Sequence, residues 1–213
     1  MATLTTVETS YGTGSRRLGP LTWAQVVAMD TTGLRAGDAV ELSDYGFAQF
    51  VWTGTLWRPR HQVLIGASGA AGAALTGSTS ESSRAAVTVP ASMMGLKGGL
   101  LIESLWSFPS SANNKNLKHR MGGLAGTVVG AVTHTTNTGA RMITTVRNRD
   151  VANSQYCSTY GNRGTDVVFT HTAVGPTAIN TAQAQDVVIS AQNGSAAEST
   201  TLEGYAVWLL PPP

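Results

Sequence analysis

From residue 87 onward, apolar and polar residues alternate in short segments with the length and composition of β-strands. Turn-forming residues such as Gly, Asn and Ser separate these segments. The pattern predicts seven strands, at 100–106, 124–134, 140–146, 154–160, 165–171, 185–191 and 200–210. Their spacing predicts a C-terminal antiparallel β-sandwich of jelly-roll type over 87–213.

The last of these segments is apolar on both of its faces. Strict alternation places the even-numbered residues from Leu202 to Trp208 on one face and the odd-numbered residues from Glu203 to Leu209 on the other. Both faces must then be covered, by a second sheet or by another subunit. We therefore expect a homotrimer in which the sandwiches share an axial core. Three prolines at 211–213 end the strand, because proline cannot donate to a ladder.

Earlier in the chain, the segment 21–29 has the apolar spacing of one short helix. Thr22 is placed to cap this helix, and Gln25 three residues later completes a capping box. Two strands are expected next, at 38–43 and 49–52, and a turn leads from the second into 55–59. The aromatic residues between 21 and 63 suffice for a small core. We expect a small α+β module over 15–65, preceded by an N-terminal tail at 1–14.

The segment 66–86 is built of Gly, Ala, Ser and Thr, with few large apolar residues. Such a segment buries too little surface to offset the entropy lost on ordering. It is therefore expected to be a linker, or to be ordered by neighbouring chains.

Composition narrows the class of protein. Of the 213 residues, 42% are hydrophobic and only 12% are charged, with a formal net charge of +2. The hydrophobic content argues against a disordered chain, and no window approaches the roughly 18 uninterrupted apolar residues of a membrane helix. The small net charge gives no reason to expect nucleic acid as a partner. A lone cysteine, Cys157, excludes an internal disulfide framework and a multi-cysteine metal site. The first residues lack the pattern of a signal peptide, so we expect assembly in a cytoplasm.

No sequence motif of a known enzyme class is present, neither a nucleophile elbow nor a phosphate-binding loop nor a zinc-protease helix. The four histidines, His61, His119, His134 and His171, are too scattered for a local metal motif, although a cluster in three dimensions stays open. We expect a protein that is not an enzyme and that needs no cofactor.

Positive charge is concentrated between residues 115 and 149. This cluster favours a site for an anionic sugar or a phosphate. The alternatives are a solvated loop with strand ends, or arginines that bridge subunits. Tyrosine and asparagine residues nearby would also suit a neutral sugar, although β-turns use asparagine as well. The candidate ligand-binding residues are Lys115, Lys118, Arg120, Arg147, Arg149, Tyr156, Tyr160 and Asn162.

Two stretches resemble parts of tailed-bacteriophage fibre and spike virion proteins. Residues 52–59 read W-T-G-T-L-W-R-P, similar to a hairpin in a small module of such proteins. The C-terminal half resembles their tip domains in three motifs: G-G-L-L at 98–101 followed by Trp106, I-T-T-V-R-N-R at 143–149, and T-L-E-G-Y-A-V-W-L-L at 201–210. Unlike a long tail fibre, the chain has no long repetitive shaft between the two modules.

The resemblance implies a short trimeric fibre or spike of the virion. Its N-terminal module would dock on other virion proteins through Trp23, Trp52, Trp57 and Arg58, and its C-terminal domain would bind a host surface glycan or receptor, without membrane insertion. The alternative is a head decoration or tail-tip protein with a purely structural role. A glycan-degrading enzyme is the third reading, which the absence of catalytic spacing disfavours.

Overall fold

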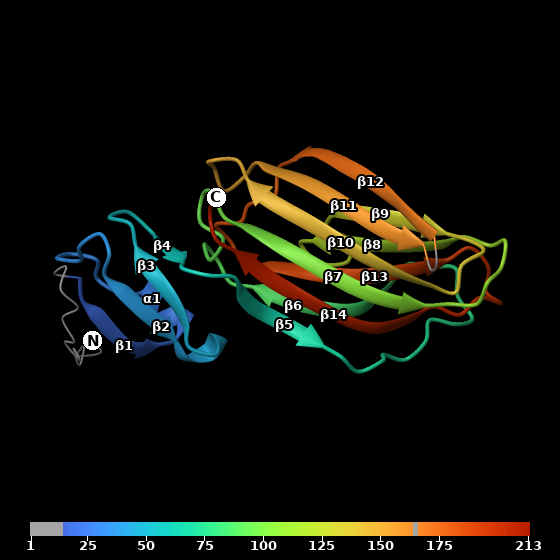
Figure 1. Ribbon diagram of the computed structural model, residues 1–213, viewed down its shortest axis with the longest axis horizontal. Coiled ribbons are helices and arrows are strands. Elements are labelled where there is room, and N and C mark those ends of the chain that lie inside the picture. Colours follow the sequence, from blue (N-terminus) through green and yellow to red (C-terminus); the bar gives the residue numbers. More distant parts are fainter. Residues whose placement is uncertain (1–14, 164–165) are drawn as a thin grey trace.

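The chain folds into a small N-terminal module and a large β-sandwich that follow one another along the long axis (Figure 1). The computed structural model describes residues 15–163 and 166–213, without the side chains of 162–176. All strand pairs are antiparallel except the first, between β1 and β2. No helix in the described part is long and apolar enough to cross a membrane. The predicted fold class, mainly β with a small α+β module and a jelly-roll sandwich, is confirmed.

A four-stranded sheet in the order β1-β2-β3-β4 and a single helical turn form the N-terminal module. The helix begins as the sequence predicts: the Thr22 side chain accepts from the Gln25 backbone, and the Gln25 side chain accepts from the Thr22 backbone. This capping box supplies acceptors for two N–H groups that the helix itself leaves unpaired. The elements are β1 (Arg17–Leu21), α1 (Trp23–Val27), β2 (Ala39–Leu42), the 3-10 turn η1 (Ser43–Tyr45), β3 (Ala48–Trp52) and β4 (Trp57–Pro59).

Aromatic rings fill the core of this module. The rings of Trp23 and Phe50 lie 5.2 Å apart, and those of Trp52 and Trp57 lie 5.4 Å apart, both pairs at a tilt. Such tilted contacts are the preferred arrangement of aromatic pairs. All four side chains are buried. The indole N–H of Trp23 also donates to the Ala91 carbonyl at 3.1 Å, which ties α1 to the start of the sandwich.

Two sheets face each other in the sandwich. One has six strands in the order β12-β11-β10-β7-β14-β5, and the other has four in the order β6-β13-β8-β9. Each of the seven segments predicted from alternation overlaps a strand, although 124–126 precede β9 and residue 165 lies outside the described residues. The elements are β5 (Val63–Ser68), β6 (Ser82–Val89), β7 (Gly99–Ser107), β8 (Lys115–Met121), β9 (Thr127–His134), β10 (Gly139–Asn148), β11 (Gln155–Arg163), β12 (Asp166–Thr177), β13 (Gln185–Asn193) and β14 (Thr201–Leu210).

The segment 66–86, expected to be a linker, belongs to the sandwich instead. It contains the end of β5 and the first residues of β6, which form edges of the two different sheets. Leu75 lies between them, is buried, and pairs with Thr200 in an isolated bridge. Small residues serve close packing here: a Cβ on Gly66 would come within 2.9 Å of Val87 Cγ1. The small side chains let the two sheet edges approach each other.

The expected strict alternation of the last strand is also wrong. A bulge between Leu202 and Gly204 shifts the register of β14 against β7. Because a one-residue shift moves side chains to the opposite face, Leu202 joins Val207 and Leu209 in the core, where all three are buried. Trp208, which the sequence placed on the face of Leu202, pairs with Leu101 and is only half-buried.

A column of polar side chains crosses the interior between the two sheets. His119 of β8 is fully buried, and its ring nitrogens lie 2.9 Å from Ser104 Oγ and 2.8 Å from Thr144 Oγ1. The Thr144 hydroxyl is also hydrogen-bonded to the Thr159 hydroxyl at 3.0 Å, and the indole N–H of Trp106 donates to Ser104 Oγ at 2.8 Å. Burial lowers the pKa of His119 to about 3. A neutral imidazole, with one donor and one acceptor nitrogen, suits the two hydroxyl partners.

Candidate ligand-binding surface

The outer face of the six-stranded sheet is uncovered in Figure 1, where β11, β10, β7, β14 and β5 lie side by side in front of the four-stranded sheet. Strand register arranges its side chains in rows. One row runs from Trp208 through Leu101 and Thr145 to Ser158, and the next from Ala206 through Glu103 and Ile143 to Tyr160. Apart from the ion pair of Glu103 and Arg141, the face is mainly apolar on β5, β14 and β7, and hydroxyl groups gather at Thr145 of β10 and along β11.

The hydroxyl-rich part consists of Thr145, Tyr156, Ser158 and Tyr160, which we call the tyrosine strip. Alternate residues of a strand share one face, so the β11 members lie in line, and Thr145 pairs directly with Ser158. Tyr156 and Tyr160 are 48% and 44% exposed, unusually open for large aromatic side chains. Four residues of strand separate them by about 13 Å. No charged residue belongs to the strip, which can offer aromatic rings and hydroxyl groups to a neutral ligand.

The backbone of Arg147 pairs with that of Tyr156, but the Arg147 side chain extends in the opposite direction, towards β7. Its side chain lies over Gly99, where a Cβ would come within 2.6 Å of Arg147 Cδ, and its guanidinium donates to the Pro211 carbonyl at 2.7 Å. The arginine thus fixes the chain end after β14. Arg149 is exposed beyond the end of β10, and its backbone N–H bonds to the Ser154 carbonyl.

The structure removes Lys115 from the candidate surface. This lysine is fully buried inside the sandwich, where its ammonium lies 2.6 Å from Ser111 Oγ, 3.0 Å from the Thr135 carbonyl and 3.3 Å from Glu198 Oε2. Hydrogen bonds from Ser111 and Asn113 lower the pKa of Glu198, which favours its carboxylate form. A buried charge persists when it is paired and hydrogen-bonded in this way. We correct the expectation: Lys115 is an internal ion-pair partner.

Lys118 and Arg120 lie on the other sheet and are already paired. The Glu81 carboxylate accepts from Lys118 Nζ at 2.7 Å, from Arg120 at 2.7 and 2.8 Å, and from Ser190 Oγ at 2.7 Å. The hydrogen bond from Arg120 is the main cause that lowers the pKa of Glu81 to about 2. One carboxylate thus engages both cations, and the group of three keeps a net charge of +1. The sequence could not reveal this, because Glu81 lies in the segment taken for a linker.

Of the eight candidate residues, the structure brings Tyr156 and Tyr160 together on one face and separates them from the lysines and Arg120. Asn162 pairs with Arg141 through its backbone, but its side chain lies outside the described residues. Thr145 and Ser158 were not among the predicted site residues. Their signal was the i, i+2 spacing of Ser158 with the two tyrosines, which becomes meaningful only when both tyrosines point outward.

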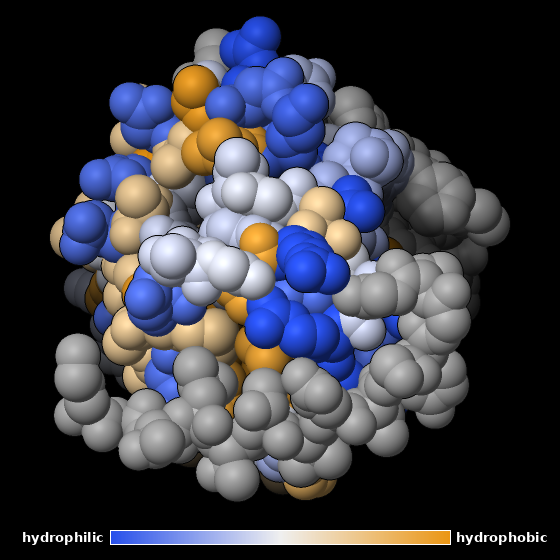
Figure 2. All heavy atoms as spheres, turned by 90° about the vertical axis from the view of Figure 1, so that its left-hand side faces the viewer, coloured by the Kyte–Doolittle hydropathy of each residue, from blue (hydrophilic) through white to orange (hydrophobic). Residues whose placement is uncertain are grey.

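The residues expected to dock on other virion proteins differ in their exposure. Trp23, Trp52 and Trp57 are buried in the module core, so they are not available to a partner, whereas Arg58 is exposed. Figure 2 views the end of the molecule formed by this module: hydrophilic residues are interspersed with smaller hydrophobic patches on the coloured part of the surface. The tryptophans make the module stable, and its polar surface must carry any docking.

Among the described residues, no group of three or more His, Cys, Asp or Glu side chains could hold a metal ion. Cys157 is buried in β11, and burial raises the pKa of its thiol. A thiol of this kind packs as a small hydrophobe.

Comparison with known proteins gives no family. No family model and no curated protein match the chain. A seed lectin of Lotus tetragonolobus is similar in structure at 8% identity, with 68% of this chain and 95% of the lectin covered and a TM-score of 0.32. Winged bean acidic lectin, complexed with methyl-α-D-galactose, is similar at 7% identity, with 84% of this chain and 92% of the lectin covered and a TM-score of 0.35. A structure of infectious bursal disease virus Gx strain is similar at 10% identity, with 76% of this chain and 43% of the viral chain covered and a TM-score of 0.27. Likenesses this distant carry no argument about function.

Proposed function

We propose that this chain is a non-enzymatic structural protein of a bacteriophage virion, a short trimeric spike or fibre that binds a host surface glycan through the tyrosine strip. The two exposed tyrosines on an uncovered sheet face carry the proposal. The phage part of it rests on the resemblance of 52–59 and the C-terminal motifs to fibre and spike proteins. If this proposal holds, the protein is located in the virion.

The chemistry of the strip favours a neutral glycan over an anionic one. Aromatic rings offer apolar faces to the C–H groups of a sugar ring, while the hydroxyls of Thr145 and Tyr156 exchange hydrogen bonds with sugar hydroxyls. Arg147 donates to Pro211, and Arg141 is paired with Glu103 at 2.6 Å. Positive charge is therefore largely engaged near the strip. The earlier expectation of an anionic ligand loses its support here.

The apolar part of the same face favours contact between subunits. Leu64 is 42% exposed, and its row continues across the half-buried side chains of Trp208 and Leu101. Leu105, which is 44% exposed, lies farther along β7, beyond Glu103. Contiguous apolar patches of this kind mark interaction sites. Three copies that meet through this area would hold three tyrosine strips on one tip and raise avidity for a repetitive polysaccharide by about 10²–10⁴.

An array of bacterial polysaccharides tests the glycan site. Wild-type protein should bind a neutral polysaccharide, and binding should fall at least about tenfold in the double variant Tyr156→Ala with Tyr160→Ala. The matched control is Phe47→Ala, which removes an exposed aromatic ring from the N-terminal module. Normal binding by the double variant, or exclusive binding to anionic polymers, would refute the tyrosine strip as the site.

Light scattering tests the trimer. Wild-type protein should have the mass of three chains, and Leu101→Glu with Trp208→Glu should yield a folded monomer because charge would then lie in the contact. A wild-type monomer would contradict the trimeric part of the proposal.

The apolar area also favours the second candidate function, a head decoration or tail-tip protein that only stabilises the particle. If no polysaccharide binds, and particles made without the chain are less stable, that purely structural role replaces the first.

A further inference from the structure

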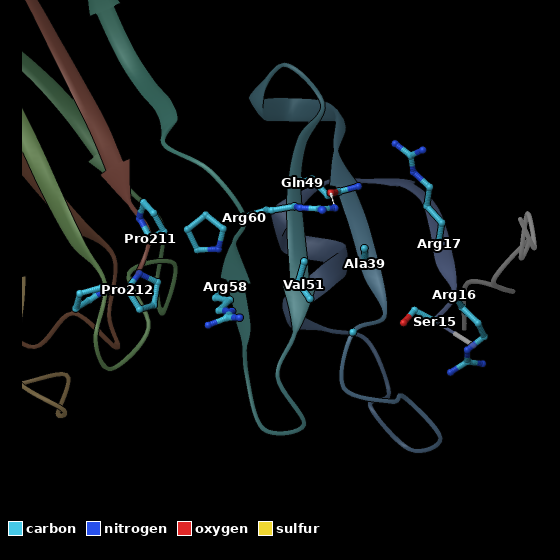
Figure 3. Close-up of a pocket in the computed structure, with 13 residues that line it drawn as sticks. Ser15, Arg16, Arg17, Ala39, Gln49, Val51, Arg58, Arg60, Pro211 and Pro212 are labelled. Carbon is cyan, nitrogen blue, oxygen red and sulfur yellow. Dashed lines mark hydrogen bonds between the residues drawn. The ribbon is translucent and has the colours of Figure 1, made fainter. Parts of the chain in front are cut away.

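A basic groove lies where the N-terminal module meets the end of the chain. Its floor is the face of the small sheet opposite the aromatic core, and Pro211 and Pro212 stand at one side (Figure 3). The groove has a volume of about 960 Å³. Register places Arg58, Val51, Ala39 and Arg17 in one row across β4, β3, β2 and β1. Short side chains in the middle of the row leave the floor open between two arginines.

Charge in the groove is unbalanced in favour of cations. Four arginines line it, and none of its lining residues, all within the described part, is acidic. Arg16 and Arg17 pair with Asp38 and Glu41. Arg60 donates to the Gln49 side chain at 2.8 Å, a neutral partner. Arg58 is exposed and has no side-chain partner among the described residues. Two guanidinium groups thus keep unused donors for a carboxylate.

The spacing of these two arginines is that of an extended chain. Arg58 and Arg60 are both exposed and flank buried Pro59; the Arg60 side chain extends across β3 to Gln49, while the Arg58 side chain stays beside β4 (Figure 3). Alternate residues of a strand lie about 6.5–7 Å apart. Acidic side chains at i and i+2 of an extended peptide have the same separation.

The lining also distinguishes a peptide from other polyanions. No aromatic side chain lines the groove, because Phe50, Trp52 and Trp57 face the opposite side of the sheet. The groove therefore lacks a stacking platform of the kind that single-stranded nucleic acids use. Ala39, Val51 and the prolines instead offer apolar contact to the small side chains between two acidic residues.

We propose that this groove binds an extended acidic peptide segment of another protein, with alternate carboxylates on Arg58 and Arg60. That the segment belongs to a virion protein rests on the proposed function; the binding of an acidic peptide does not. Docking through the groove replaces docking through the tryptophans. Both modules contribute, since the hydrogen bond from Arg147 to Pro211 holds the proline side in place.

Fluorescence anisotropy of the full chain with a labelled peptide of alternating glutamate and threonine, blocked at both ends, tests the proposal. Wild-type protein should bind this peptide and not its glutamine counterpart. Arg58→Gln with Arg60→Gln should weaken binding at least about tenfold. The matched control removes two exposed positive charges elsewhere, Arg35→Gln with Arg141→Gln, and should change affinity less than about twofold. Binding should weaken as salt rises from about 0.01 M to 0.15 M.

Three results would overturn the assignment: no binding to wild-type protein, equal loss in the control variant, or tighter binding of inorganic polyphosphate than of the peptide. Thermal unfolding of each variant checks its fold, and Arg58→Gln alone serves if the double variant is unstable, since the Arg58 side chain bonds to no described residue. The array experiment does not involve the groove, so the glycan site and the peptide site can fail separately.

Discussion

The N-terminal module and the sandwich are filled in different ways, although their buried apolar residues form one continuous cluster. Around α1, the module packs the rings of Trp23 and Phe50 against each other, with their centroids 5.2 Å apart. The sandwich places a hydrogen-bonded column through His119 at the middle of its interior. Aromatic packing does not depend on protonation, whereas the column depends on an imidazole that stays neutral. The two parts should therefore respond differently to cavities, crowding and acid.

The largest effect should come from the aromatic core. Phe50 is fully buried, so Phe50→Ala should lower the free energy of unfolding by about 4 kcal/mol through lost burial and the cavity left behind. Hydrogen exchange should accelerate in β2 and β3 while β10 and β13 keep their protection. If the sandwich strands lose protection equally, the two parts form one cooperative unit and the contrast between them does not extend to stability.

Adding a methyl group beside the polar column should lower the free energy of unfolding by somewhat less. A Cβ on Gly130 would collide with the hydroxyls of Thr144 and Thr159, so Gly130→Ala should destabilise the sandwich by about 2–3 kcal/mol in urea unfolding. Gly69→Ala is the control, because nothing lies within 4 Å of its Cβ position. Equal stability of the two variants would mean that the column has room to move aside.

The third-largest effect should be a loss of stability at acid pH, caused by His119 in the polar column. The pKa of His119 is about 3 in the folded chain and about 6.5 when unfolded. Between these values only the unfolded chain binds the proton, so stability falls as pH drops below 6.5, by about 2 kcal/mol at pH 5. His119→Gln should remove this dependence between pH 7 and pH 5. A slope that survives the substitution would assign the titration to another group.

The smallest effect concerns the charge cluster outside the core. Glu81→Gln should cost about 1 kcal/mol at neutral pH, because the amide can still accept hydrogen bonds and water partly screens the ion pairs, whose side chains are 16–22% exposed. With a folded pKa of about 2, the Glu81 carboxylate contributes stability above pH 4.5, and this contribution is lost as pH falls from 4.5 towards 2. Unfolding of both proteins at pH 3 and pH 7 checks this, since their difference should shrink at the lower pH.

Local sequence patterns correctly predicted those elements whose structure depends on residues adjacent in the chain. The capping box of Thr22 and Gln25 is complete within four residues, and the strand of 140–146 follows from alternation alone. The strand β8 was missed because its inward positions alternate between charged or polar residues and apolar ones: Lys115, Leu117, His119 and Met121. Such a strand becomes recognisable only when the partners of the polar positions are known.

Those partners lie far away in the sequence. Lys115 meets Glu198, Lys118 and Arg120 meet Glu81, and His119 meets Ser104 and Thr144. Pairing with carboxylates that are distant in the sequence thus turned an apparent anion site into contacts within the chain. The tyrosine strip was found in part, because exposure of Tyr156 and Tyr160 depends on which face of β11 points outward. The basic groove was not found, since its wall and floor come from opposite ends of the chain.

The way the module joins the sandwich has a mechanical consequence. β5, the first strand after the module, lies antiparallel to β14, with Val63 opposite Leu209 and Ser68 opposite Tyr205. Both strands run in the general direction of the long axis (Figure 1). Tension between the module and the far end of the sandwich would load the hydrogen bonds of this pair together, in shear, instead of opening them one at a time. Under such tension, the exposed connection at 60–62 between the module and β5 should extend first, before the strands of the sandwich separate.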